Sequence, residues 1–145
     1  MRTIGALEAG GTKMVLAVYT EAGEELERLT LPTESPEITL PKMADFFRER
    51  GVDALGVGSF GPLDLNPGSP TYGYITTTPK LAWKNYDICG YFREHLGVPV
   101  GFDTDVNGSM LGEATWGCAK GLDTAIYITI GTGIRMWPPS GCCMP

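Results

Sequence analysis

The order of strand-like and helix-like segments is the feature that most restricts what this chain can fold into. Three strand patterns come first, with only short glycine-containing turns between them: Thr3–Leu7, Met14–Tyr19 and Glu25–Leu31. Helix and strand patterns then alternate, at Pro41–Arg50, Ala54–Gly58, Tyr86–Leu96, Val98–Phe102, Val106–Trp116 and Thr124–Ile130. This order predicts an α/β fold that opens with a three-strand antiparallel meander. It departs from the regular strand–helix alternation of a dinucleotide-binding fold.

Composition and charge restrict the possible partners. The chain has 145 residues, 43% of them hydrophobic and 19% charged, as in a globular domain with its own core. The formal net charge of -6 argues against nucleic acid or an anionic membrane as a partner. No segment reaches the about 20 apolar residues of a membrane span, and the first residues lack the apolar core of a signal peptide. We therefore expect a cytoplasmic protein. The four cysteines fit neither a disulfide framework nor a metal-ligand spacing.

A glycine-rich turn, Glu8–Lys13, joins the first two strand patterns. A Gly-Gly-Thr turn lets the backbone approach a ligand closely and direct N–H groups at an anion. A Walker P-loop is excluded because it needs four residues between its glycines and a helix after its lysine, whereas Lys13 runs directly into a strand. The dinucleotide-binding fingerprint fails on the same ground. An ordinary hairpin turn remains the alternative.

A second turn of this kind follows the last strand pattern, where Gly131, Thr132 and Gly133 come directly after Ile130. Two such turns on separate sheets could hold a polyphosphate from both sides. Here too, an ordinary hairpin is the alternative.

Asp105 follows a predicted buried strand and begins a predicted helix. Ligands of α/β sheets bind beyond the carboxyl ends of the strands, so this position favours function. Aspartate is also a preferred helix cap, and a capping role alone would explain the residue. The two roles are compatible, because the helix dipole favours a negative charge there and a carboxylate can accept a hydroxyl proton during phosphoryl transfer.

The run GSFGPLD at residues 58–64 opens a long segment rich in glycine, proline and threonine, Gly61–Pro79, which predicts an irregular loop. Loops of this length inside a compact domain are usually functional or disordered. Backbone and hydroxyl groups here could meet a polyol. A glycine-proline turn without a ligand is the alternative.

These four features, in this order, resemble the ROK family of bacterial sugar kinases, named for repressor, open reading frame and kinase. The resemblance is closest to the fructokinase branch. The runs that carry it are LEAGGTK, GVGSFGPLD, YGYITTTPKLAW, DTDVNGSMLGEATWG and AKGLDTAIYITIGTGI, which together span Leu7 to Ile134. It implies the N-terminal lobe of an actin/hexokinase-like (ribonuclease H-like) fold.

The resemblance also implies roles for individual residues. It assigns the two phosphate turns to Gly10, Gly11, Thr12 and Lys13 and to Gly131, Thr132 and Gly133. It places Glu8 near Mg²⁺, makes Asp105 the general base, and puts the sugar at Gly61, Pro62, Thr78 and Thr104. The implied reaction transfers the γ-phosphoryl group of ATP to a hexose, converting fructose to fructose 6-phosphate. Many family members carry Asn before the catalytic Asp, whereas this chain has Thr104. A glucokinase or an N-acetylmannosamine kinase is the alternative.

Family members are much longer than this chain, because the fold needs two lobes that close over the nucleotide. We therefore expect residues 1–122 to form the N-terminal lobe and residues 123–134 to begin the second lobe, the rest of which is missing. Residues 135–145 do not look like the expected continuation, and a shifted reading frame after Ile134 is our hypothesis for this aberrant tail. The family's zinc-binding His/Cys cluster would lie beyond the chain.

Three further expectations depend on this length. The chain alone should be inactive and should expose an apolar face that promotes association, whereas a full-length relative is expected to be a homodimer. A fragment of a sugar-sensing ROK repressor is the other class of function. It is disfavoured because the first strand begins at Thr3, which leaves no room for a DNA-binding module before it.

Overall fold

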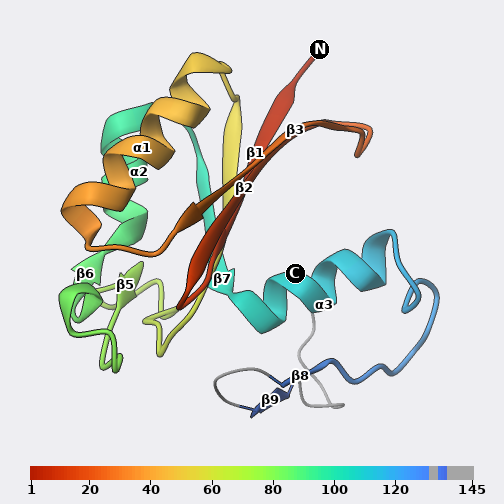
Figure 1. Cartoon of the computed structure of the whole chain (residues 1–145). Coiled ribbons are helices and arrows are strands. Elements are labelled where there is room, and N and C mark those ends of the chain that lie inside the picture. The colour runs from red at the N-terminus through yellow and green to blue at the C-terminus, as the bar shows by residue number, and fades with distance from the viewer. Residues whose placement is uncertain (131–133, 137–145) are drawn as a thin grey trace. The chain divides into compact units, whose positions relative to one another are not determined.

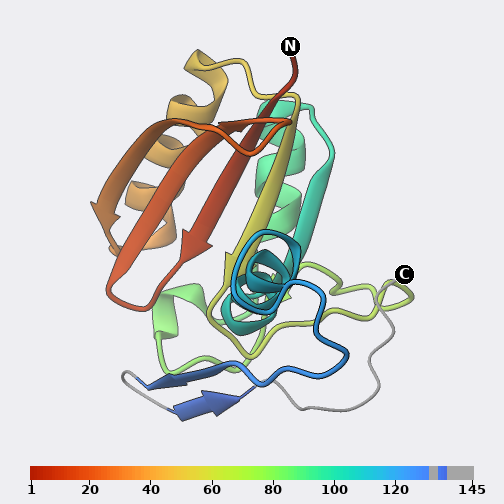
Figure 2. The same ribbon diagram turned by 90° about the vertical axis from the view of Figure 1, so that its right-hand side faces the viewer.

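The computed structural model describes residues 1–130 and 134–136. The chain divides into two units, Met1–Asp105 and Val106–Pro145, which we describe separately. The first unit is a sheet with two helices packed on one of its faces (Figure 1). Figure 2 looks onto the sheet, with these helices behind it.

The sheet of the first unit has five strands in the order β3-β2-β1-β4-β7. Its strands are β1 (Thr3–Ala9), β2 (Lys13–Thr20), β3 (Glu25–Pro32), β4 (Ala54–Ser59) and β7 (Val100–Thr104). β1, β2 and β3 form the antiparallel meander that the sequence predicts, while β1, β4 and β7 run parallel to one another. The predicted α/β fold class is therefore confirmed. The three parallel strands end at the same edge of the sheet.

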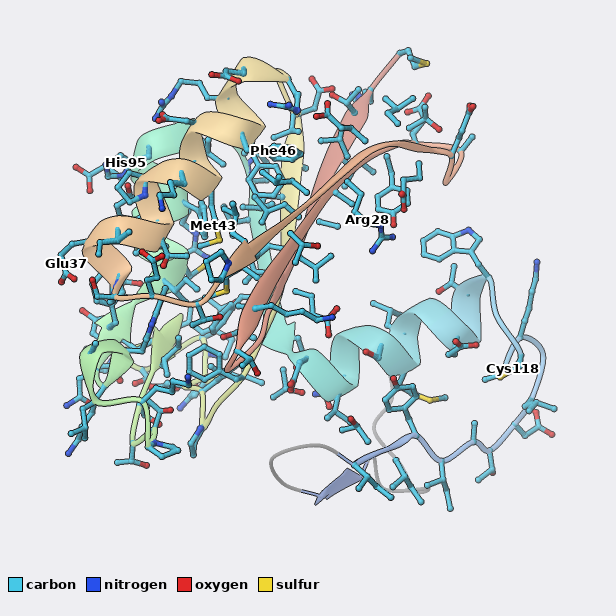
Figure 3. The ribbon with its side chains drawn as sticks, viewed as in Figure 1. Arg28, Glu37, Met43, Phe46, His95 and Cys118 are labelled. Carbon is cyan, nitrogen blue, oxygen red and sulfur yellow. The ribbon has the colours of Figure 1, made fainter. Side chains whose placement is uncertain are left out.

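The core lies between the sheet and the helices α1 (Pro36–Glu49) and α2 (Ile88–Leu96). Side chains alternate between the two faces of a strand, so Leu7 and Ala9 of β1 are buried whereas Glu8 is exposed. Figure 3 shows Met43 and Phe46 between α1 and the sheet, and Arg28 of β3 on the opposite face. Within residues 1–105, no helix covers that opposite face.

Five predicted boundaries in the first unit are wrong by two to five residues, among them the end of β1, which reaches Ala9 rather than Leu7, and the end of β7, which reaches Thr104 rather than Phe102. Helix α1 begins at Pro36 rather than Pro41, because the fixed φ of proline suits the first helical position and the buried stripe already starts there. Helix α2 begins at Ile88 rather than Tyr86, where the Asp87 side chain accepts a hydrogen bond from the Gly90 N–H. Strand β7 begins at Val100 rather than Val98.

The segment predicted as one irregular loop, Gly61–Pro79, contains a short strand. β5 (Tyr74–Ile75) pairs with β6 (Tyr86–Asp87), and a 3-10 turn, η1 (Leu81–Trp83), lies between them. The Asp64 carboxylate accepts hydrogen bonds from the hydroxyls of Ser69 and Thr71. These contacts give the segment a defined path along the sheet edge.

The second unit contains α3 (Asp105–Thr115), which begins at the last residue of the first unit, and an antiparallel pair, β8 (Ile128–Ile130) and β9 (Ile134–Met136). The strand predicted at Thr124–Ile130 is therefore only its last three residues. Gly131, Thr132 and Gly133 lie outside the described residues, as do residues 137–145 of the predicted tail. The predicted lobe boundaries at residues 122 and 134 stay predictions.

In the described part of the chain, no helix is both long enough and apolar enough to cross a membrane. The described cysteines are not paired: Cys89 is buried and Cys118 is exposed.

Candidate active site

Three segments that the sequence analysis singled out follow the ends of the three parallel strands. Ala9 of β1, Ser59 of β4 and Thr104 of β7 occupy one register row across the sheet. Gly10, Phe60 and Asp105 come directly after them. Because neighbouring strands lie about 4.8 Å apart, the first glycine turn and Asp105 are separated by the width of β4 alone. The fold therefore brings these segments to one edge of the sheet.

The first glycine turn is tight at Gly10. The Gly10 N–H donates to the Lys13 carbonyl at 3.0 Å, and a β-carbon at Gly10 would lie 2.6 Å from that oxygen. Only glycine fits without a shift of the backbone. Within the described residues, the N–H groups of Gly11 and Thr12 donate to no protein acceptor. Two backbone donors at the tip of the turn are therefore available to an anion.

The turn is held from both sides, by Thr33, which the sequence analysis did not select, and by Phe60 of the GSFGPLD run. The Thr33 hydroxyl donates to the Gly10 carbonyl at 2.8 Å, and the Thr33 N–H donates to the Thr12 carbonyl at 2.9 Å. On the β4 side, the Phe60 N–H donates to the Ala9 carbonyl at 2.8 Å. The turn is thus fixed before any ligand binds.

Two carboxylates share one row on the sheet face opposite α1 and α2. Glu8 of β1 and Asp103 of β7 both pair with Gly58 of β4, which has no side chain to separate them. A hydrogen bond to Glu25 raises the pKa of Arg28, and the nearby charge of Glu8 adds to this effect. The Thr104 N–H donates to the Asp103 carboxylate at 2.7 Å. Asp103 was not among the predicted site residues.

No group of three or more potential metal ligands gathers among the described residues. Mg²⁺ needs no such group, because it keeps several waters and binds one or two protein carboxylates together with substrate phosphates. The donor set of Glu8 and Asp103 beside the glycine turn fits that requirement.

Asp105 is half-buried at the start of α3. A β-carbon at Gly58 would lie 3.5 Å from the Asp105 Cα and 3.6 Å from the Thr104 carbonyl oxygen. These are ordinary contact distances, so the backbone at Asp105 lies directly beside the end of β4.

The residues predicted to bind sugar lie in two environments. Gly61 is buried at the end of β4 and is joined to Pro62 by a cis peptide bond, and Thr104 is half-buried at the end of β7. Thr78 is buried further along, and its hydroxyl accepts a hydrogen bond from the Lys80 N–H at 3.2 Å. Gly61 and Thr104 are thus at the common edge, whereas Thr78 belongs to the segment that precedes η1.

Comparisons with known proteins place these features in a family. The ROK family model matches residues 4–136. Over 131 residues the chain is 46% identical to the fructokinase of Pediococcus pentosaceus, a match that covers 90% of this chain and 46% of that protein. It is 47% identical to the fructokinase of Lactococcus lactis subsp. cremoris, covering 90% of this chain and 44% of the relative. The chain spans less than half the length of both relatives.

A solved structure shares the fold. The ROK family glucokinase of Streptomyces griseus, in complex with glucose and AMPPNP, superposes with a TM-score of 0.72 at 25% identity. The match covers 92% of this chain and 43% of the glucokinase.

Proposed function

This chain belongs to the ROK family, and from that premise we propose that it supplies half of the catalytic cleft of an ATP-dependent fructokinase. Fructose is favoured over glucose because identity to the two fructokinases is 46–47%, against 25% to the glucokinase of known structure. The single observation that carries the proposal is that the glycine turn, Glu8 and Asp105 lie at the one edge of the sheet where the parallel strands end.

The phosphate groups of ATP would bind at the first glycine turn. The N–H groups of Gly11 and Thr12 would donate to phosphate oxygens, and Lys13 would add a positive charge. Glu8 and Asp103 would hold Mg²⁺ beside the phosphates. When bound, this ion supplies charge neutralisation for the transferred group. By the resemblance, Gly131, Thr132 and Gly133 would hold the phosphates from the other lobe.

Asp105 would act as the general base. Its carboxylate would accept the proton of the sugar 6-hydroxyl as that oxygen attacks the γ-phosphorus and the bond from this phosphorus to ADP breaks, with ADP leaving. Gly61, Pro62, Thr78 and Thr104 would orient the sugar so that this hydroxyl faces both Asp105 and the phosphate. Holding the two substrates in this geometry removes most of the entropic cost of their encounter.

A chimera tests the proposal directly. Residues 4–130 of this chain replace the matching part of the Lactococcus lactis fructokinase, and ATP consumption is measured with fructose, glucose, mannose and N-acetylmannosamine. We expect fructose to have the highest kcat/KM. A folded chimera that turns over another of these sugars and not fructose would contradict the substrate assignment.

The same chimera tests the role of Asp105. Asp105→Asn should lower kcat by about 10²–10⁴-fold, the usual contribution of a general base. Asp123→Asn, at an exposed position of the second unit, is the matched control and should leave kcat unchanged. A loss below about tenfold would remove Asp105 from the role of general base.

A further inference from the structure

The Lys80 side chain lies over the first glycine turn. A β-carbon built on Gly11 would be 3.5 Å from the Lys80 Cε, so the charged end of this side chain is next to the turn. Lys80 itself is exposed. The two residues are far apart in sequence, and no local pattern connects them. The tertiary structure therefore brings the two residues together.

The backbone of Lys80 is held in place on both sides. Its N–H donates to the Thr78 hydroxyl at 3.2 Å, and its carbonyl accepts from the Trp83 N–H at 2.9 Å. Thr78 and Trp83 are both buried. The charged side chain thus starts from a fixed position, although its end is in solvent.

Trp83 connects this fixed position to the glycine turn itself. Its indole N–H donates to the Glu34 carbonyl at 2.9 Å, and Glu34 directly follows Thr33, which hydrogen-bonds the turn. Its ring packs edge-to-face on Phe60, at 6.0 Å between centroids, and the Phe60 N–H donates to Ala9. The same supports therefore position both the turn and Lys80.

The charges around the turn favour an anionic ligand. Lys13 directly follows the two free backbone N–H groups in the sequence, and the Lys80 Cε lies next to Gly11, so two cationic residues accompany the turn. The whole chain is acidic, with a formal net charge of -6, so this local positive charge is not part of a general basic surface. A phosphate chain is the ligand class that such a pair of cations and backbone donors recognises.

We propose that Lys80 is a phosphate-contacting residue of the nucleotide site, positioned over the Gly10–Lys13 turn by Thr78 and Trp83. The inference rests on the proposed function, because it takes the turn to be a phosphate site. Lys80 would be the second cation of the site, after Lys13, and it belongs to a segment outside both glycine turns. Lys80 would bind the triphosphate, and this binding requires the positive charge at the end of its side chain.

The experiment is a titration of the 145-residue chain with sodium tripolyphosphate, followed by the backbone amide NMR signals of Gly11 and Thr12. The variants are Lys80→Met, Lys80→Gln and Lys80→Arg. Lys84→Met removes another exposed cation, on the other side of η1, and is the matched control. The indole N–H signal of Trp83 shows whether each variant keeps the supports of the turn.

We expect Lys80→Met and Lys80→Gln to weaken tripolyphosphate binding about tenfold, the effect of losing one charge-assisted hydrogen bond near solvent. Lys80→Arg and Lys84→Met should bind within about twofold of the wild type. If Lys80→Met and Lys80→Gln bind as tightly as Lys84→Met while the Gly11 and Thr12 signals still move, Lys80 has no phosphate role and the turn keeps its own. If these signals do not move in the wild type, the phosphate turn itself is wrong, and the role of Lys80 with it.

Discussion

The two units of the chain differ in where their large apolar side chains lie. The largest fully buried side chains of the described residues, among them Trp83, Phe47 and Phe92, all belong to residues 1–105. In the described part of the second unit, the buried apolar residues are only Val106 and Ala119. Large apolar side chains there are exposed instead: Leu111, Trp116, Leu122, Ile126, Ile128 and Ile130.

The two units therefore differ in how much the burial of apolar side chains stabilises them. The first unit buries a continuous core between its sheet and two helices, and such burial is the dominant stabilising term in folding. The second unit has helix and strand hydrogen bonds but little burial. The candidate site residues that the structure describes, from Glu8 to Asp105, all belong to the stable first unit.

The strongest test of this contrast is a pair of tryptophan variants. Trp83→Ala should lower the free energy of unfolding by about 3–5 kcal/mol, because it empties a buried site and removes the indole bond to Glu34. Trp116→Ala, where the side chain is 72% exposed, should cost less than about 0.5 kcal/mol. Urea unfolding followed by circular dichroism measures both. Equal losses would mean that the second unit also buries its apolar side chains in solution.

A smaller effect should distinguish the two glycines of the first turn. Gly10→Ala should destabilise the protein by about 1–3 kcal/mol, since the new methyl group would meet the Lys13 carbonyl oxygen. Gly11→Ala should cost less than about 0.5 kcal/mol, because its nearest neighbour is the Lys80 Cε at an ordinary contact distance of 3.5 Å. The same urea titrations report both values. If Gly11→Ala were the more damaging change, the turn would have a different conformation.

One ion pair of the first unit should contribute less to the free energy of unfolding than the buried core does. Its contribution should depend on pH in a defined direction. Arg50 donates two hydrogen bonds to Glu27, at 2.5 and 2.7 Å, which joins β3 to the end of α1. This hydrogen bonding lowers the pKa of Glu27 in the folded protein. The contribution to stability is therefore present above the pKa of Glu27 in the unfolded chain, and it is lost as the pH falls through the lower, folded-state pKa.

Glu27→Gln should consequently lower the urea midpoint at pH 7, and the difference from the wild type should shrink as the medium becomes acidic. Glu24→Gln, at an exposed position of the β2–β3 turn, is the control. A difference that grows on acidification would contradict the direction of the pKa shift.

The smallest effect on unfolding should come from β8. Ile130→Thr changes a side chain that is 77% exposed and should alter the free energy of unfolding by less than about 0.5 kcal/mol. It should instead reduce self-association, which we expect of the wild type because contiguous exposed apolar side chains drive it. Sedimentation velocity measures this. A wild-type chain that is monomeric at every concentration would remove the expected association.

The predicted fold succeeded where the signals are local. An apolar run at Thr3–Leu7, strand-forming residues at Met14–Tyr19, alternation at Glu25–Leu31 and the short turns between them predict the three-strand meander, and all of these depend only on near neighbours. Boundaries were less accurate. Pro41 resembles a helix start, but the buried stripe that decides where α1 begins includes Pro36. The strand predicted at Thr124–Ile130 has the right composition, but only Ile128–Ile130 find a partner strand.

Among the candidate site residues too, those marked by local sequence were predicted and those brought in by tertiary contacts were not. Gly10, Gly11 and Asp105 were selected from turn chemistry, helix-start chemistry and a family resemblance. Thr33, Asp103 and Lys80 were not selected. Lys80 and Asp103 stand in runs that carry the resemblance, but the contacts that bring Thr33 and Lys80 to the turn, and the row that Asp103 shares with Glu8, depend on residues distant in sequence. Thr33 reaches the turn through the pairing of β2 with β3, and Lys80 reaches it through the anchoring of Trp83.

The sequence by itself therefore determined the family, the order of the elements and the position of the first glycine turn, because each depends on residues that are close together along the chain. Tertiary structure alone decided which residues surround the first glycine turn. Parallel pairing of β1, β4 and β7 aligns their ends, and burial of Trp83 places a lysine beside a glycine that is distant in sequence. Such neighbours are set by the packing of the whole unit, which no short stretch of sequence encodes.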